Sequence, residues 1–172
     1  MSTQQTDAFF PDTITDRRQK WYSFNLQSMN EQSIFASRNS LPKSVYRFLW
    51  LGFNEHPLCI RIEQETGKPA QLFAKKTDGI GEMEPCNILL EKEMQITAEQ
   101  FAELERQLDS ISFWTLPTSE DVPLGTDGER WIFEALHSGR YHIVDRWCPQ
   151  IIARDRPLVE LGRLFVGAAQ LE

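Results

Sequence analysis

The sequence predicts a single α+β domain, residues 16–172, in which a mainly antiparallel sheet of about six strands is packed by two or three helices. Residues 131–147 are typical of a β-hairpin, because aromatic and β-branched runs flank the turn pair Ser138-Gly139. Residues 45–95 contain short strand-like runs joined by brief turns, and a β-meander is the simplest topology for them. Residues 97–112 and 156–170 repeat apolar side chains at helical spacing.

The amino-terminal part is the least regular. Residues 1–15 are polar and are expected to be disordered. Residues 16–44 are expected to form a helical and irregular arm, with a helix that begins near Asp16 and carries Trp21 and Phe24. These aromatic side chains either anchor the arm to the body of the domain or form an exposed docking arm.

The predicted meander has four strands. Val45–Leu51 is apolar except at Arg47, so we expect a central strand that is covered on both faces. Leu58–Glu65 alternates between apolar and polar residues, as a strand with one buried face does. Gln71–Lys76 and Ile88–Gln95 complete the set.

Two helices and a loop follow. Thr97 and Gln100 have the spacing of a capping box, which predicts the start of the helix at 97–112. Residues 113–130 form a long acidic loop and are a candidate binding rim, since long loops often carry function. Pro157 favours a helix start for residues 156–170.

A two-residue turn in the hairpin predicts which side chains share a face. Glu134 then lies opposite Ile143, and Ile132 lies opposite Asp145. Glu134 and Asp145 share one face, whereas His142 points to the other. A histidine–carboxylate relay within the hairpin is therefore disfavoured.

The weak catalytic candidates are Glu134, His142, Asp145 and His56. The two carboxylates could serve as acid and base, although neutralisation by arginines of neighbouring strands, such as Arg47 or Arg61, is favoured because buried charges are normally paired. The sequence contains no familiar nucleophile, phosphate-binding or metal-binding motif, so it predicts no metal and no cofactor.

Several motifs resemble those of a family of uncharacterised bacterial proteins. They are Trp21-Tyr22-Ser23, Tyr46–Leu51, His56-Pro57, Arg61–Glu63, Phe113–Pro117, Asp127-Gly128, Trp131–Glu134 and Gly139–Pro149. The likeness covers most of the chain. The family pattern has a second histidine, a glycine and a serine where this chain has Glu55, Ala135 and Cys148. The resemblance implies no established activity, and a site that needs the second histidine is not expected here.

Charge, hydropathy and cysteine content restrict which classes of partner and which cellular compartment are expected. The net charge of −7 disfavours nucleic acid. It would favour a basic protein partner, although the simpler interpretation, that the charge keeps the protein soluble, is preferred. No apolar run is long enough to span a membrane, and the first 25 residues lack the layout of a secretion signal. The cysteines have neither metal-ligand nor redox spacing. We therefore expect a cytoplasmic protein.

The sequence favours a non-catalytic protein-binding module. A specific form is an immunity protein that sequesters a basic bacterial toxin. The alternatives are a hydrolase or transferase that uses Glu134, Asp145 and histidines, and a structural homodimer that pairs through a sheet edge or the amino-terminal aromatics. The candidate binding residues are Trp21, Tyr22, Trp114, Glu120, Asp121, Asp127 and Arg146.

Overall fold

A computed structural model describes residues 8–41, 44–79, 87–120 and 128–171. One antiparallel sheet has the strand order β4-β3-β2-β1-β5-β6, so the predicted α+β fold class is confirmed. The elements are α1 (Asp16–Ser28), β1 (Ser44–Leu51), β2 (Leu58–Gln64), β3 (Gln71–Thr77), β4 (Ile88–Gln95), α2 (Ala98–Ser110), β5 (Arg130–His137), β6 (Arg140–Trp147) and α3 (Arg156–Ala168), with short 3₁₀ turns at Phe113–Thr115, Pro149–Ile151 and Ala153–Asp155.

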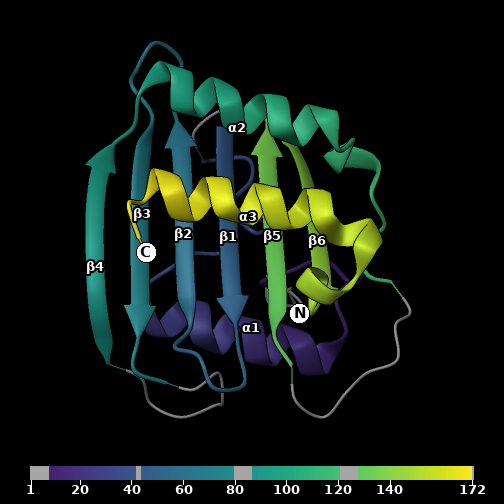
Figure 1. The fold of residues 1–172 in the computed structure, drawn as a ribbon. Coiled ribbons are helices and arrows are strands. Elements are labelled where there is room, and N and C mark those ends of the chain that lie inside the picture. Colours follow the sequence, from purple (N-terminus) through teal and green to yellow (C-terminus); the bar gives the residue numbers. More distant parts are fainter. Residues whose placement is uncertain (1–7, 42–43, 80–86, 121–127, 172) are drawn as a thin grey trace, which may run out of the picture.

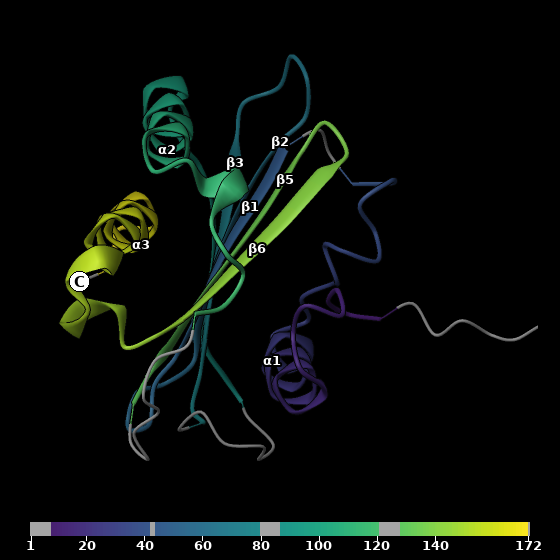
Figure 2. The ribbon, with the colours of Figure 1, turned by 90° about the vertical axis from the view of Figure 1, so that its right-hand side faces the viewer.

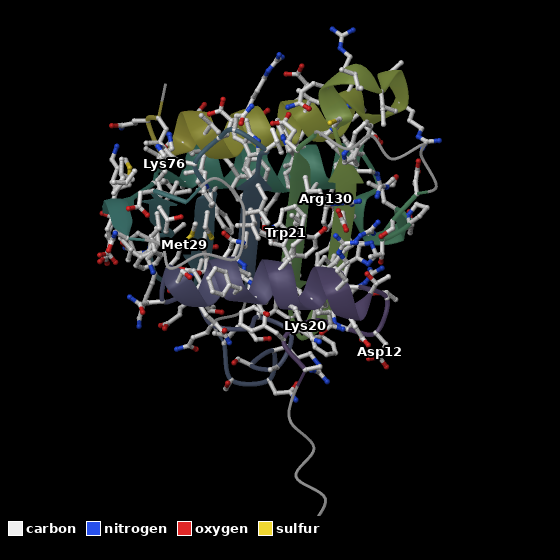
Figure 3. The ribbon with its side chains drawn as sticks, turned by 90° about the horizontal axis from the view of Figure 1, so that it is seen from below. Asp12, Lys20, Trp21, Met29, Lys76 and Arg130 are labelled. Atoms are coloured by element: carbon white, nitrogen blue, oxygen red, sulfur yellow. The ribbon has the colours of Figure 1, made fainter. Side chains whose placement is uncertain are left out.

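The molecule has three layers. Helix α1 crosses one face of the sheet, and α2 and α3 cover the other (Figures 1 and 2). A view from the end of the sheet shows α1 and α3 on opposite sides of the strands (Figure 3). We call the two sides the α1 face and the α2/α3 face. No helix in the described ranges is long and apolar enough to cross a bilayer.

The central position of β1 follows from its apolar sequence. Seven of its eight residues are buried, and it lies between β2 and β5. Strands β1 to β4 are neighbours in chain order and form a meander. Phe48 stacks on Phe133 of β5 with ring centroids 4.8 Å apart, and both rings belong to the core beneath α2 and α3. The carboxyl-terminal hairpin thereby completes the main core.

The register of the hairpin is the one that its turn predicts. Glu134 pairs with Ile143, and Ile132 pairs with Asp145. Ser138 and Gly139 both have positive φ, 49° and 80°, as a tight hairpin turn requires. The alternation of faces along both strands is therefore the predicted one.

Local signals explain how the helices begin and pack. Thr97 and Gln100 form the predicted capping box at the start of α2. In α3, Gly162 lies against the ring of Trp131, where a β-carbon would collide with the indole. The absence of a side chain at Gly162 lets α3 approach the sheet closely.

The amino-terminal segment differs from the expectation of disorder. Phe10 and Ile14 are buried, and they pack with Tyr22 and Leu26 of α1 against the α1 face. The segment therefore serves as a third layer rather than as an exposed docking arm. Residues 1–7, which belong to the same expectation, lie outside the described residues.

Candidate functional site

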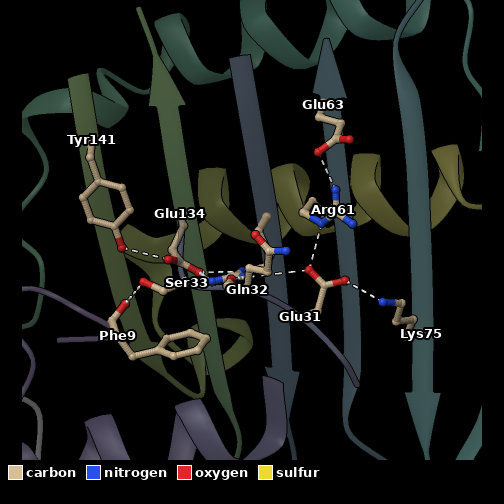
Figure 4. A network of polar contacts seen from close by, with 10 residues as sticks. Phe9, Glu31, Gln32, Ser33, Arg61, Glu63, Lys75, Glu134 and Tyr141 are labelled. Carbon is tan, nitrogen blue, oxygen red and sulfur yellow. Dashed lines mark hydrogen bonds and ion pairs between the residues drawn. The ribbon is translucent and has the colours of Figure 1, made fainter. Parts of the chain in front are cut away.

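A network of buried polar side chains lies between the sheet and the segment after α1 (Figure 4). Arg47 of β1 is fully buried, and its Nη2 lies 2.5 Å from Oε2 of Glu134 on β5. Its Nη1 donates to the carbonyl oxygen of Gln32 at 2.7 Å. The other carboxylate oxygen of Glu134 accepts from the hydroxyl of Tyr141 at 2.8 Å. Glu134 is thus an internal counter-ion of Arg47.

Glu31 is the second anion of this network. Its carboxylate lies 2.8 Å from Nε of Arg61, 2.9 Å from Nζ of Lys75 and 3.6 Å from Nη1 of Arg47. Burial raises the pKa of Glu31, but Arg61 and Arg47 outweigh that effect, and the net result is a pKa below the ordinary value. Glu31 therefore stays ionised and neutralises cations from three neighbouring strands.

Asp145 of the edge strand β6 forms a second buried cluster on the α1 face. Its carboxylate lies 2.8 Å from Nη1 of Arg130 and 3.3 Å from Nη1 of Arg18, and it accepts from the hydroxyl of Tyr22 at 2.9 Å. Burial, followed by the charge of Asp145, raises the pKa of Tyr22 well above its ordinary value. Tyr22 therefore stays protonated and acts as a hydrogen-bond donor to Asp145.

The candidate histidines lie apart from these carboxylates. His142 is on the α2/α3 face of β6, where its Nε2 donates to the carbonyl of Leu116 at 2.8 Å. Burial lowers the pKa of His142, which keeps the imidazole neutral near pH 7. His56 lies in the loop between β1 and β2, with Nδ1 3.0 Å from the carbonyl of Gly79. The fold therefore keeps Glu134 and Asp145 on one face of the hairpin, but it places His142 on the other face and His56 in a loop.

The cavities near the buried carboxylates differ in size. A cavity of about 250 Å³ borders the network of Arg47 and Glu31 and is lined by residues that include Gln32, Arg61 and Glu63, but by none of the four catalytic candidates. A cavity next to Asp145 and Arg146 has a volume of about 10 Å³, which admits roughly one water molecule. Among the described residues, no three histidine, cysteine or carboxylate side chains form a group that could hold a metal. The arrangement supports charge neutralisation in the interior rather than acid–base chemistry.

The predicted binding residues are dispersed. Tyr22 and Arg146 are buried, and Arg146 lies 3.3 Å from Asp155 and 3.6 Å from Glu120, so Tyr22 and Arg146 do not form a surface. Trp21 is partly buried against the core under α1. Trp114 is partly exposed, with the guanidinium of Arg140 4.9 Å from its ring. Asp121 and Asp127 lie outside the described residues.

An apolar groove that the sequence reasoning missed lies at one end of the central strands. Phe53 and Ile151 are 50% and 76% exposed, unusual values for large hydrophobic side chains. Together with Gly52, Glu55, Gly128, Glu129, Cys148 and Gln150 they line a groove of about 420 Å³, here called the Phe53–Ile151 groove. The available signal was a large apolar residue in each of two short connecting segments that also contain a proline, Pro57 and Pro149.

The rim of this groove is acidic. Glu129 accepts from the indole Nε1 of Trp50 at 2.6 Å. Burial raises the pKa of Glu129, and the neighbouring charge of Glu55 adds to the increase. Two carboxylates close enough to influence one another give this end of the sheet a negative potential that favours a cationic group.

No family model matches the chain, and no curated protein is similar to it in sequence.

Proposed function

We propose that this chain is a non-catalytic protein-binding module whose partner is a basic protein. The observation that carries the proposal is the Phe53–Ile151 groove, in which exposed apolar side chains stand beside Glu55 and Glu129. An exposed apolar patch with a polar rim is typical of a protein interaction site. The acidic rim and the net charge of −7 favour a partner of opposite charge, which charge steering would bring to the surface quickly.

The contacts of the catalytic candidates support a function without catalysis. Glu134 and Asp145 are internal counter-ions, whereas His142 and His56 contact the backbone carbonyls of Leu116 and Gly79. An enzyme that used these groups would need at least two of them in one open pocket with perturbed pKa values. Of the four candidates, only Asp145 lines the small cavity beside Arg146, and none lines the cavity beside Arg61 and Glu63.

Co-purification from native cells after mild cross-linking tests the proposal. Ile151→Asp places a charge in the groove, and Gln170→Asp adds the same charge at an exposed position after α3. We expect a stoichiometric basic protein with the unmodified chain and with Gln170→Asp, and its loss with Ile151→Asp. Recovery of the bare chain, or a partner that Ile151→Asp leaves bound, would contradict the proposal.

A specific form of this function is an immunity protein that holds a bacterial toxin inactive in the cytoplasm. Cys59 and Cys148 are free thiols, as is typical of a reducing compartment. Within the proposed family likeness, Glu55 and Cys148 are two positions at which this chain departs from the family pattern, and both line the groove. Such differences suit a surface that matches different partners. Expression of the captured protein alone should arrest growth, and co-expression of this chain should restore it.

A further inference from the structure

The two edge strands of the sheet, β6 and β4, differ in whether other residues pair with their outer backbone groups. On β6, the backbone N–H of Asp145 points outward and donates to the carbonyl of Thr118 at 2.7 Å. Arg146 donates to the same carbonyl at 3.0 Å, so the segment before residue 119 covers part of this edge. Within the described ranges, no backbone group pairs with the outer side of β4 along Glu91–Gln95. Here β4 presents an open edge.

The register identifies the backbone groups that this edge exposes. Gln71 pairs with Gln95, and the N–H of Ile96 donates to the carbonyl of Ala70 at 3.0 Å, which makes Ala70 and Ile96 a hydrogen-bonded pair. In antiparallel strands, hydrogen-bonded pairs alternate with pairs that are not hydrogen-bonded. The backbone N–H and carbonyl groups of the even-numbered residues of β4 from 90 to 94 therefore point toward β3. The N–H and carbonyl groups of Glu91, Glu93 and Gln95 therefore point away from the sheet.

Two of the side chains beside these backbone groups are acidic and form no ion pair with a described residue. Glu91 and Glu93 are exposed on the α1 face, opposite Lys75 and Phe73, and neither forms an ion pair with a described residue. Lys75 is turned toward Glu31 instead, at 2.9 Å. Before them, at an irregularity in the pairing of β3 and β4, Leu89 is 56% exposed.

We propose that the β4 edge binds an extended strand of a basic protein, in which lysine or arginine alternates with apolar residues. This inference rests on the proposed function and specifies how the partner binds. The partner strand would extend the sheet through the outward backbone groups of Glu91, Glu93 and Gln95. Its basic side chains would lie beside the two glutamates, and its apolar side chains would continue the opposite face, where Leu90 and Met94 pack on the core.

A second copy of this chain meets like charges when the two-fold axis lies at Glu91, Lys92 or Glu93. Antiparallel pairing of two β4 strands about a two-fold axis at Lys92 places Lys92 opposite itself and Glu91 opposite Glu93. Shifting the axis to Glu91 places Glu91 opposite itself instead. Like charges directly opposite one another destabilise a strand pair, so the residues that keep copies apart select a strand of the opposite charge.

The test uses a short synthetic peptide of alternating lysine and valine, titrated into isotope-labelled protein and followed by NMR. The first control peptide has the same composition with all lysines grouped, and the second replaces lysine by glutamate. We expect the alternating peptide alone to shift the amide signals of Glu91, Glu93 and Gln95 and to slow their hydrogen exchange. Equal binding of the grouped peptide, or shifts that avoid β4, would overturn the proposal.

Variants separate backbone pairing from general charge. Glu93→Lys should weaken peptide binding by about tenfold, because an opposite-charge pair becomes a like-charge pair. Glu103→Lys makes the same change in net charge at an exposed position on α2 and should weaken binding by less than about twofold. Glu93→Pro removes an outward N–H while leaving the β3 ladder intact, and should abolish binding that Glu93→Gln retains. Equal effects of Glu93→Lys and Glu103→Lys would overturn the proposal even if the proline variant fails to fold.

The experiments distinguish a failure of this inference from a failure of the proposed function. Ile151→Asp should still bind the peptide at β4, because the groove lies on other strands. A captured basic partner that leaves the amide signals of Glu91 and Glu93 unchanged would overturn this inference and keep the proposed function. Dimerisation through β4 at high protein concentration would make a second copy the occupant and would also overturn it.

Discussion

Replacement of Arg47 by methionine tests whether the buried charges are structural counter-ions. The guanidinium of Arg47 is fully enclosed and contacts Glu134 through Nε at 2.6 Å and Nη2 at 2.5 Å. Arg47→Met keeps most of the side-chain volume but leaves Glu134 with only the hydroxyl of Tyr141 as a donor. It also removes the donor to the carbonyl of Gln32.

The expected cost follows from these contacts. Removal of one partner from a buried ion pair costs about 3–5 kcal/mol, because the other charge stays buried without compensation. The lost donor to Gln32 adds about 1 kcal/mol. Since a domain of this kind is stable by about 5–15 kcal/mol in total, Arg47→Met is expected to approach the limit of folding. The double variant Arg47→Met/Glu134→Leu removes both charges and should regain most of the loss, to within about 2 kcal/mol of the unmodified protein.

Urea unfolding followed by tryptophan fluorescence measures these differences, with Glu134→Leu as the fourth member of the double-mutant cycle. Glu134→Leu leaves Arg47 with Glu31 at 3.6 Å as its nearest carboxylate and should itself be costly. The reasoning is refuted if Arg47→Met lowers the free energy of unfolding by less than about 1 kcal/mol, as an exposed pair would. It is refuted equally if the double variant is no more stable than either single variant.

Three further predictions concern packing, pH and thiol access. Gly162→Ala should destabilise by about 1–3 kcal/mol, because the new methyl group collides with Trp131, whereas Gly167→Ala in the same helix has open space and should stabilise by about 0.5–1 kcal/mol in thermal unfolding. The pKa of Glu31 is lowered in the folded state, so its stabilising contribution is complete above the ordinary carboxyl pKa of about 4.3 and is lost as the pH falls through the lowered value. The difference in free energy of unfolding between the unmodified protein and Glu31→Gln should therefore be constant from about pH 8 to 5 and shrink below about pH 4. Cys59 is buried, and burial raises the pKa of its thiol. In a variant in which the other cysteines are replaced by serine, a thiol reagent should therefore label Cys59 only as fast as the protein unfolds globally. Rapid labelling in native buffer would contradict the burial of Cys59.

The hairpin and the central strand were predictable because local rules determine them. A two-residue turn at Ser138-Gly139 leaves one register, and that register places Glu134 and Asp145 on the same face. The nearly apolar run of β1 requires cover on both sides, which also predicts that Arg47 must be neutralised inside. Pairing of Arg47 with Glu134 was therefore within reach of sequence reasoning.

Glu31 and the amino-terminal layer were not predictable by the same route. Glu31 lies in a segment rich in serine, asparagine and glutamine, where no periodicity distinguishes a buried carboxylate from an exposed one. Its burial depends on Arg61 and Lys75 of two distant strands, so only the tertiary structure reveals it. Phe10 and Ile14 are isolated apolar residues in a polar context, and their anchoring depends on the face that α1 covers.

The Phe53–Ile151 groove lies at the end of the sheet at which the open edge of β4 begins. The registers of the sheet align Trp50, Leu58, Lys76 and Leu90 in one row across β1 to β4. Three strand spacings of about 4.8 Å place the β4 end of this row roughly 14 Å from the β1 end, which is well within the span of an ordinary interface of about 800 Å² per partner. Phe53 follows β1 and Leu89 precedes Leu90, so two of the three exposed large hydrophobic side chains of the described residues flank this row. A single basic partner could therefore fill the groove and add its strand to β4 at the same time.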